Sequence, residues 1–453
     1  MTSVRDQQAR LIVVGGGLAG CEAAWQASRR GVEVVLYDMK PERLSAAHLS
    51  EDLAELVCSN SLRAQPVHNA VGLLKEEMRR LGSLILEAAD ATSVPAGRAL
   101  AVDRTGFAQY VTRAIEENPR IELRRELVSQ IPDDPLVVLA TGPLTAPEMA
   151  RDLQRLLGEE YLYFYDAIAP TLYTDSIDSS VVFRASRYEE GEGDYLNVPL
   201  DANQYRAFVD ALLEAETVPL HAFERALYFE GCLPIEEMAR RGPQTLAYGP
   251  MKPVGLVDPR TGKRPHAVVQ LRQEDASGIL FNLVGFQTKL RIGEQKRIFR
   301  TLPGLEKAVF ARFGSVHRNT YVNAPLRLEP SLELKARKGL YLAGQMAGVE
   351  GYVESAALGG LAGTHAARAA LGLPGVQPLP ESAHGALLAH LGNASSRDFQ
   401  PMNVNFGLFP PLDAPSGPGR PRKQPKREKH AAMAARGLEA IERYRSAVAV
   451  ETA

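Results

Sequence analysis

A glycine run near the start of the chain has the residue types and spacing to bind a phosphorylated ligand. It follows the apolar segment 11–14 and comprises Gly15, Gly16, Gly17, Leu18, Ala19 and Gly20. Asp38 ends the next apolar run. A G-x-G-x-x-G turn between a strand and a helix, with an acid roughly 20 residues further on, is typical of a dinucleotide-binding βαβ unit.

Each part of this unit has a physical role. Gly15 permits the tight turn, Gly17 lets the backbone approach a pyrophosphate, and Gly20 lets the helix pack on the strand. The helix N-terminus presents unpaired N–H groups and a positive dipole end to phosphates, and Asp38 can accept a hydrogen bond from a ribose. The alternative is a tight turn without a ligand, but the whole context favours an adenine dinucleotide.

Two further strand-like runs also end in small residues, at 140–142 and at 344–360. Three such ends in one chain are typical of FAD enzymes of the glutathione-reductase type, and an NAD enzyme would not need the last one. We expect the last helix to place N–H groups near the flavin pyrimidine edge. The additional residues predicted at the FAD site are Thr141, Gly142, Gly344, Gln345, Gly359 and Gly360.

Two cysteines lie in polar or Gly/Pro-rich turns, where a thiol can be exposed. Cys58 is followed by Ser-Asn-Ser, and Arg63 could stabilise its thiolate. Cys232 lies between Gly231 and Leu233, and Glu230 and Glu236 could act as bases nearby. The alternative is that both are small buried fillers, the usual environment of cysteines outside disulfides. Cys21, in the first turn of the first helix, is expected to be structural.

Length and composition narrow the class of protein. The 453 residues suggest two or three domains. The net charge of −2 gives no global attraction for nucleic acid, so any RNA contact must come from local basic patches. Three scattered cysteines without a CxxC pair predict neither a disulfide framework nor a metal site. The N-terminus lacks a signal peptide or membrane span, which predicts a cytoplasmic protein that does not bind membranes.

The elements that must position these residues form an α/β pattern. Residues 11–38 predict a βαβ unit. A predicted strand at 339–345 and a predicted helix at 355–370 indicate that the chain re-enters the same domain there. We therefore predict a glutathione-reductase-like Rossmann FAD-binding domain that is split in sequence by an inserted α/β domain. The predicted bounds are 1–182 and 334–453 for the FAD-binding domain and 183–333 for the insertion.

Three other segments complete the prediction. Residues 70–89 show helical periodicity, and residues 431–448 show that of an amphipathic C-terminal helix. The basic, Pro-rich run 417–430 is either a solvated linker or an arm that contacts phosphates.

Motifs spread over residues 10–448 make the chain resemble the bacterial folate- and FAD-dependent tRNA (uracil-5-)-methyltransferases. The cysteine-bearing segments, AELVCSNSLR at 54–63 and GCLPIEEMA at 231–239, are more specific than the glycine run. The other segments are GGGLAG at 15–20, AVDRTGF at 101–107, GPMKPVGL at 249–256, NLVGFQTKL at 282–290, HRNTY at 317–321 and GQMAGVEGYVES at 344–355.

The resemblance implies that the chain forms ribothymidine in the T-arm of tRNA. It implies 5,10-methylenetetrahydrofolate as carbon donor, FAD as carrier and reductant, and NAD(P)H to re-reduce the flavin. A thiolate that adds to uracil carbon 6 creates an enolate, whose carbon 5 can attack a methylene electrophile. By match to the family motif, Cys232 is the candidate for that thiolate. Cys58 is the candidate for a second thiol, near the flavin, that handles the methylene adduct or removes the carbon 5 proton.

The resemblance also suggests substrate contacts. His48 is expected to stack on the folate pterin, and Glu350 and Tyr352 to line the folate pocket. No obligate protein partner is implied. The candidates for tRNA phosphate contacts, whose alternative is a solvated basic face, are Lys289, Arg291, Arg297 and Arg318.

Three other functions share part of this pattern. A flavoprotein that modifies the wobble uridine of tRNA has the FAD motifs, but also a C-terminal helical domain for which we expect no room. A small-molecule flavin oxidoreductase would leave the cysteine motifs without a role. A non-catalytic flavin-binding tRNA chaperone would make both thiols structural.

Overall fold

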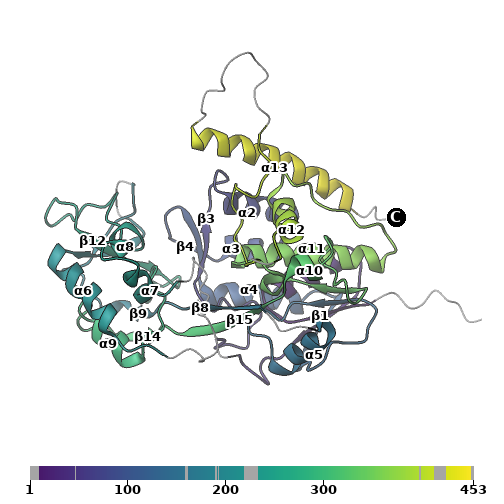
Figure 1. Cartoon of the computed structure of the whole chain (residues 1–453), viewed down its shortest axis with the longest axis horizontal. Helices are drawn as coiled ribbons and strands as arrows, with labels where there is room; N and C mark the ends of the chain where they lie inside the picture. The colour runs from purple at the N-terminus through teal and green to yellow at the C-terminus, as the bar shows by residue number, and fades with distance from the viewer. Residues whose placement is uncertain are drawn as a thin grey trace, which may run out of the picture.

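The chain folds into two α/β domains that are joined by a two-stranded ribbon (Figure 1). The computed structural model describes residues 10–45, 47–158, 162–188, 191, 193–218, 233–396, 399–412 and 425–449, without the side chains of 162–167 and 316–320.

The larger domain is built on a parallel sheet of five strands. Their order is β16-β7-β1-β2-β6, and every neighbouring pair is parallel. The three strands β1, β7 and β16 are continuous, fully buried apolar runs, as expected where helices cover both faces of a parallel sheet, whereas the edge strand β6 is polar. The pairing of β16 with β7 confirms that the chain returns to this domain after the insertion. The strands are β1 (Leu11–Val14), β2 (Val34–Asp38), β6 (Ile121–Arg125), β7 (Val137–Leu139) and β16 (Leu340–Leu342).

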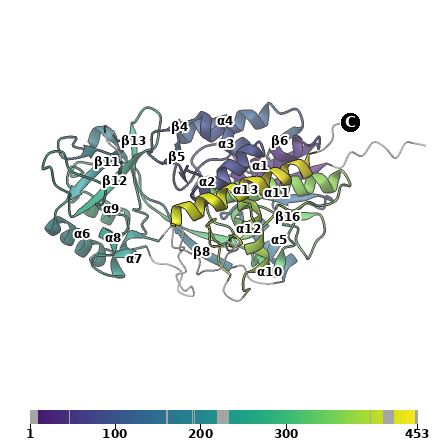
Figure 2. The same cartoon turned by 90° about the horizontal axis from the view of Figure 1, so that it is seen from above.

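Several helices and a small antiparallel sheet surround this parallel sheet, and α13 packs across α2 (Figure 2). The small sheet has the order β3-β5-β4 and leads directly out of the Cys58 loop. Its strands are β3 (Ser61–Ala64), β4 (Ser93–Val94) and β5 (Ala99–Val102). The helices are α1 (Leu18–Ser28), α2 (Ala70–Arg80), α3 (Leu84–Ala91), α4 (Arg104–Glu116), α5 (Pro147–Leu157), α10 (Ala324–Arg327), α11 (Tyr352–Ala370), α12 (Ala383–Asn393) and α13 (Lys426–Val448).

The helical periodicity predicted over 70–89 is confirmed, with one interruption. The structure has two helices there, α2 and α3, because Gly82 between them adopts a left-handed backbone conformation with φ +71°.

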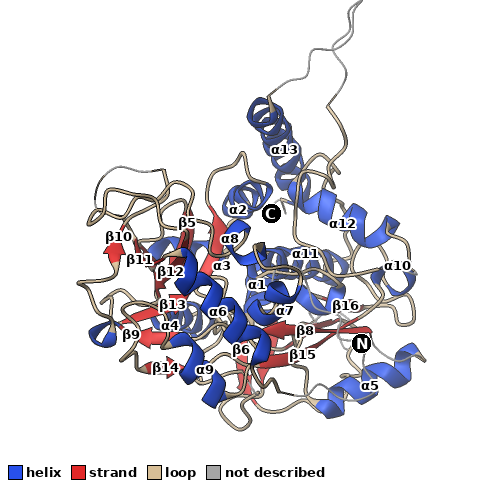
Figure 3. Ribbon diagram, turned by 60° about the vertical axis from the view of Figure 1, so that its left-hand side comes forward, coloured by secondary structure: helices blue, strands red, loops and turns tan. Residues whose placement is uncertain are grey.

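The inserted domain has a six-stranded antiparallel sheet of order β10-β11-β12-β13-β9-β14. Four helices share its hydrophobic core (Figure 3). The strands are β9 (Thr171–Tyr173), β10 (Phe183–Arg184), β11 (Tyr195–Leu200), β12 (Ala267–Gln273), β13 (Leu280–Leu283) and β14 (Phe310–Arg312). The helices are α6 (Ala202–Glu214), α7 (Ile235–Arg240), α8 (Thr245–Tyr248) and α9 (Ile292–Phe299).

The bounds predicted for the insertion, 183–333, differ from this arrangement. Strand β9 lies before residue 183 yet pairs within the six-stranded sheet, and the core of that domain includes Ala169 and Ala308. The ribbon of β8 (Leu162–Ala167) and β15 (Val316–Tyr321) carries the chain in and out. We propose bounds near 168 and 315. The sequence missed them because β9 is too short to show a periodicity of its own.

Helices α1 and α11 pack in close contact, and this contact explains why α11 has glycine at two positions. A Cβ on Gly359 would lie 2.2 Å from the carbonyl oxygen of Ala19, and one on Gly363 would lie 2.2 Å from that of Ala23. Gly359 and Gly360 lie inside α11 and do not form its N-terminus. The prediction that their N–H groups lie near the flavin was therefore wrong, because those groups are inside the helix and Gly359 serves the helix crossing.

The crossing predicts a stability difference between two adjacent glycines. Gly359→Ala should lower the free energy of unfolding by about 1–3 kcal/mol because the added methyl overlaps backbone. Gly360→Ala is the matched control: its Cβ would lie 3.4 Å from the Glu22 side chain, an ordinary van der Waals contact, so the change should be neutral or stabilising by up to about 1 kcal/mol. Urea unfolding of both variants measures the difference, and equal stability would contradict the packing argument.

Candidate active site

A cleft lies at the carboxyl edge of the parallel sheet, where ligands bind in open α/β sheets. It encloses about 1150 Å³, counting solvent at its open mouth. The ends of β1, β7 and β16 meet there, so three segments far apart in sequence form one surface. The predicted FAD-site residues that line it are Gly15, Gly16, Gly17, Leu18, Ala19, Asp38, Thr141, Gly142, Gly344 and Gln345.

The glycine turn leaves room for a ligand at one position and closes the fold at another. A Cβ on Gly17, the N-cap residue of α1, would meet nothing within 4 Å and would project into open space. Gly142, in the Ala-Thr-Gly turn, is equally open. In contrast, a Cβ on Gly20 would lie 1.7 Å from the carbonyl oxygen of Gly15. Gly20 is therefore a packing residue of the turn and does not line the cleft.

The Asp38 side chain fixes the conformation of the glycine turn through hydrogen bonds to the backbone. Its carboxylate accepts hydrogen bonds from the backbone N–H groups of Gly16 (2.8 Å) and Lys40 (2.9 Å), and the residue is buried. A side chain that can face a ribose is thus already fixed by two backbone donors. The open glycines, the helix N-terminus and the buried acid fit the adenine dinucleotide half of FAD.

Cys21 lies behind the turn and has the expected structural role. Its thiol is buried and donates to the carbonyl oxygen of Gly16 at 3.3 Å. Burial raises the pKa of this thiol above its usual value, which keeps it protonated.

The cleft also reaches the segment that leads to Cys58. Its lining includes Glu55, Val57, His48 and Tyr352. The hydroxyl oxygen of Tyr352 accepts hydrogen bonds from the backbone N–H of Cys58 (2.6 Å) and of Ser59 (3.1 Å). Burial raises the pKa of Tyr352, so the phenol stays protonated. One side chain therefore joins the start of α11 to the loop that carries the thiol.

His48 faces the same cleft, as a pterin-stacking residue would. Its Nδ1 lies 2.6 Å from the hydroxyl of Ser45, and burial followed by the charge of Lys40 lowers its pKa. The imidazole is therefore neutral at physiological pH.

Glu350, predicted beside Tyr352 in the folate pocket, is buried and does not line the described cleft. Its backbone N–H donates to the carbonyl of Met402 at 3.2 Å, which ties the start of α11 to segment 399–412.

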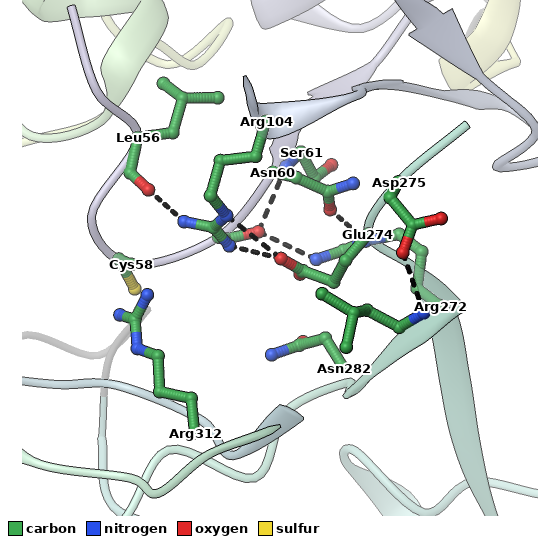
Figure 4. A network of polar contacts seen from close by, with 12 residues as sticks. Leu56, Cys58, Asn60, Ser61, Arg104, Arg272, Glu274, Asp275, Asn282 and Arg312 are labelled. Atoms are coloured by element: carbon green, nitrogen blue, oxygen red, sulfur yellow. Dashed lines mark hydrogen bonds and ion pairs between the residues drawn. The ribbon is translucent and has the colours of Figure 1, made fainter. Parts of the chain in front are cut away.

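Three arginines hold the Cys58 loop (Figure 4). Arg104 donates to the carbonyl oxygen of Leu56, and Arg312 donates to that of Val57. Arg272 donates to the Ser59 hydroxyl (2.7 Å) and to the Asn60 side-chain oxygen (2.9 Å). Each residue on either side of Cys58 from 56 to 60 thus has an arginine partner. These arginines were missed in the sequence because nothing local marks them.

Arg63, the arginine predicted to stabilise the Cys58 thiolate, points elsewhere. Its guanidinium pairs with the fully buried Glu354 and donates to the Asn403 side chain at 2.7 Å. That expectation was wrong. The backbone of Arg63 has a positive φ of 62°, and the side chain is directed to α11, the helix that carries Glu354.

Cys232 lies outside the described residues, but the start of α7 next to it is described. The Ile235 N–H donates to the Gln287 carbonyl at 2.7 Å, which fixes this segment. Glu236 is fully buried, and it accepts hydrogen bonds from Thr288 Oγ1 (2.9 Å) and the Lys289 N–H (2.8 Å). Burial raises the pKa of Glu236.

The four candidates for tRNA contact differ in exposure. Lys289 is buried and forms an ion pair with Glu237 at 2.6 Å. Arg291 and Arg297 are exposed, and each pairs with a nearby glutamate. The side chain of Arg318 is not described.

Two searches of the described residues gave negative results. No group of three or more His, Cys, Asp or Glu side chains among them could hold a metal ion. None of the described helices is both long and apolar enough to cross a membrane.

Comparison with known proteins identifies the family in two steps. Residues 10–374 match the family model described as glucose inhibited division protein A. The structure superposes on Aquifex aeolicus GidA with a TM-score of 0.69 at 17% identity, covering 98% of this chain and 74% of that one. The fold and the cleft therefore define a GidA-type FAD-binding protein.

The relatives found by sequence similarity define a narrower family than the family model does. The chain is 57% identical over 437 residues to a protein from Geobacter sulfurreducens named methylenetetrahydrofolate–tRNA-(uracil-5-)-methyltransferase TrmFO, covering 96% of this chain and 99% of that protein. A protein of the same name from Moorella thermoacetica is 55% identical and covers 95% and 97%. The chain belongs to the TrmFO family.

The open space at Gly17 predicts a selective effect on cofactor binding. Gly17→Val should weaken FAD binding about tenfold or more, because its side chain occupies the path of the pyrophosphate. The free energy of unfolding without FAD should change little, since the backbone there is extended. Gly293→Val, at an exposed and equally open glycine, is the control. Flavin fluorescence titration of the apoproteins measures the effect, and an unchanged affinity would contradict this position of the cofactor.

Proposed function

We propose that this chain methylates carbon 5 of the T-loop uridine of tRNA, with 5,10-methylenetetrahydrofolate as carbon donor and FAD as cofactor. The observation that carries the proposal is one continuous cleft. It is lined both by the glycine turn of β1–α1 and by Glu55 and Val57, which precede Cys58. A flavin-binding site and a thiol loop share that surface, as this reaction requires.

The residues divide into three groups by the part of the reaction they serve. The glycine-rich strand ends and Asp38 bind FAD. His48 and Tyr352, which also line the cleft, are proposed to orient the folate, with the neutral His48 imidazole suited to stacking on a pterin. Cys58 and Cys232 are proposed as the two thiols.

The chemistry at the uracil needs a nucleophile and a proton acceptor. Cys232 is proposed to add to carbon 6, which makes carbon 5 nucleophilic toward the methylene group, and Cys58 to handle the methylene adduct or take the carbon 5 proton. After the carbon 5 proton and the folate nitrogen have left, hydride addition to the methylene carbon expels Cys232 from carbon 6, which restores the uracil double bond and frees the thiolate. Once reduced by NAD(P)H, bound FAD supplies the hydride that completes the methyl group. The Tyr352 hydroxyl holds the backbone of Cys58, which keeps that thiol at the cleft.

Two basic regions are proposed to contact tRNA phosphates. Arg291 and Arg297 are exposed at α9 in the inserted domain. The second region comprises Arg98, Arg427 and Lys429, all exposed, where the start of α13 approaches the β4–β5 turn. Burial and the charges of Arg427 and Arg98 lower the pKa of His68 between them. Residues 413–424 of the predicted basic arm lie outside the described residues. A tRNA substrate also implies a cytoplasmic enzyme.

The proposal predicts the outcome of methylation by purified holoenzyme. With undermodified tRNA transcript, methylenetetrahydrofolate and NADH, nucleoside mass spectrometry should detect 5-methyluridine. Cys58→Ala and Cys232→Ser should each lower the rate about 100-fold or more while FAD is retained. Cys21→Ser is the matched control, because its hydroxyl can still donate to the Gly16 carbonyl. No product from FAD-loaded protein would refute the function, and an active Cys58→Ala variant would refute that residue's role.

The basic surface predicts a smaller salt dependence of tRNA affinity after a single substitution. Each lost phosphate contact lowers the slope of log K against log salt by about 1. Arg427→Ala should therefore weaken binding and reduce the slope, whereas Arg155→Ala, which removes an exposed arginine from α5, should do neither. Filter binding at several salt concentrations measures both. Identical slopes would exclude this surface.

A further inference from the structure

Positive charge is concentrated around Cys58 by residues from both domains. Arg104 begins α4 of the FAD-binding domain, whereas Arg272 in β12 and Arg312 at the end of β14 belong to the inserted domain. Arg272 is 8% exposed, and the Arg104 side chain is 19% exposed. Figure 4 shows the Arg312 guanidinium directed toward the Cys58 sulfur. Charges in such a position are only weakly screened by salt.

The described contacts do not balance this charge. Glu274 forms an ion pair with Arg104. The contacts of Arg312 and Arg272 with the loop are to neutral oxygens: a carbonyl, a hydroxyl and an amide. Because all three guanidiniums remain protonated at neutral pH, the described cluster carries more positive than negative charge. Burial lowers the pKa of Arg272 and of Arg312, and for Arg312 the next cause is the charge of Arg104.

Buried charge of one sign is expected to be matched by a group of the other sign. Two ionisable groups interact electrostatically with all three arginines, the Glu274 carboxylate and the Cys58 thiol. Glu274 can balance one of the three guanidinium charges, which leaves Cys58 as the further group that can supply an anion. A thiolate is the anion that this residue can supply, and it is also the form that reacts.

We infer that Arg104, Arg272 and Arg312 stabilise the negative charge on the Cys58 sulfur when this thiol reacts, and that Glu274 limits the effect by neutralising one guanidinium. The inference rests on the proposed function, in which Cys58 is a reacting thiol. The arginines are positioning residues, because they contact the loop and act on the sulfur through its charge. Two of the three come from the inserted domain, so the reactivity of Cys58 depends on the docking of that domain.

Alkylation of the holoenzyme tests the inference without tRNA or folate. Iodoacetamide labelling at fixed pH, resolved by peptide mass spectrometry, gives separate rates for Cys58 and Cys232. Arg312→Gln should slow labelling of Cys58 about fivefold, because one cation near the sulfur is lost while a hydrogen-bond donor to Val57 remains. The Cys232 rate should not change. Arg312→Lys should restore most of the Cys58 rate, since it restores the charge.

Arg187→Gln is the matched control. Arg187 is also a half-buried arginine of the inserted domain that donates to a backbone carbonyl, that of Val254 at 2.8 Å, and burial lowers its pKa too. Its substitution should leave the Cys58 labelling rate unchanged.

Glu274→Gln gives a prediction of opposite sign. Removal of the counter-charge should speed labelling of Cys58 by a similar factor. A loop that simply loosens would speed labelling in both Arg312→Gln and Glu274→Gln, and that result would overturn the inference. It would also be overturned if Arg312→Gln labelled at the wild-type rate, or if Arg312→Lys were as slow as Arg312→Gln. Should Arg312→Gln fail to retain FAD, an unchanged or slower rate in Glu274→Gln overturns the inference by itself.

These outcomes are separable from those of the methylation assay. Labelling that follows the charge changes in a protein that forms no 5-methyluridine would refute the proposed function and leave the inference standing. Methylation with labelling that ignores the charge would do the reverse.

Discussion

The structure depends on how the Cys58 loop is held between its two domains. This loop has no regular secondary structure, so its conformation must come from contacts with other segments. Arginines from α4, β12 and β14 supply them, and Asn60 adds hydrogen bonds to the carbonyls of Val102 and Gln273, one in each domain. A loop that is fixed from both sides loses its conformational entropy when the protein folds. The thiol therefore needs no further ordering when a substrate binds.

The same contacts define the interface of the two domains. Asp103, the N-cap residue of α4, accepts from the N–H of Ala276, and Tyr195 donates its hydroxyl to the carbonyl of Ala96. The adjacent Arg104–Glu274 ion pair is largely buried. Such a pair adds little net stability, but removing one partner leaves an uncompensated charge. The ion pair therefore disfavours other relative positions of the two domains more than it stabilises the folded state.

How much the sequence could predict depends on how far apart in sequence the interacting residues lie. The glycine turn and Asp38 form a local pattern, and so does the strand that became β16; the structure has a strand, turn and helix where each pattern predicted them. The role of Gly359 depends on Ala19, which is more than 300 residues away in sequence, and a glycine in an Ala-rich segment carries no sign of that partner. The arginines around Cys58 also lie in other segments of the sequence. Arg63, which is nearer to Cys58 in sequence than any of them, instead pairs with Glu354.

The cleft is therefore built in two different ways in its two parts. Around the glycine turn, backbone geometry dominates, so the fold persists in GidA at 17% identity. Around the Cys58 loop, specific side chains dominate, and they come from both domains. Tyr352 connects the two parts: it begins α11, which follows β16 after a short turn that carries Gly344 and Gln345, and its hydroxyl holds the backbone of Cys58. A shift of α11 toward or away from the cleft would thus move this backbone with it. This connection explains how a loop that is not part of the parallel sheet can be held next to the cleft at the edge of that sheet.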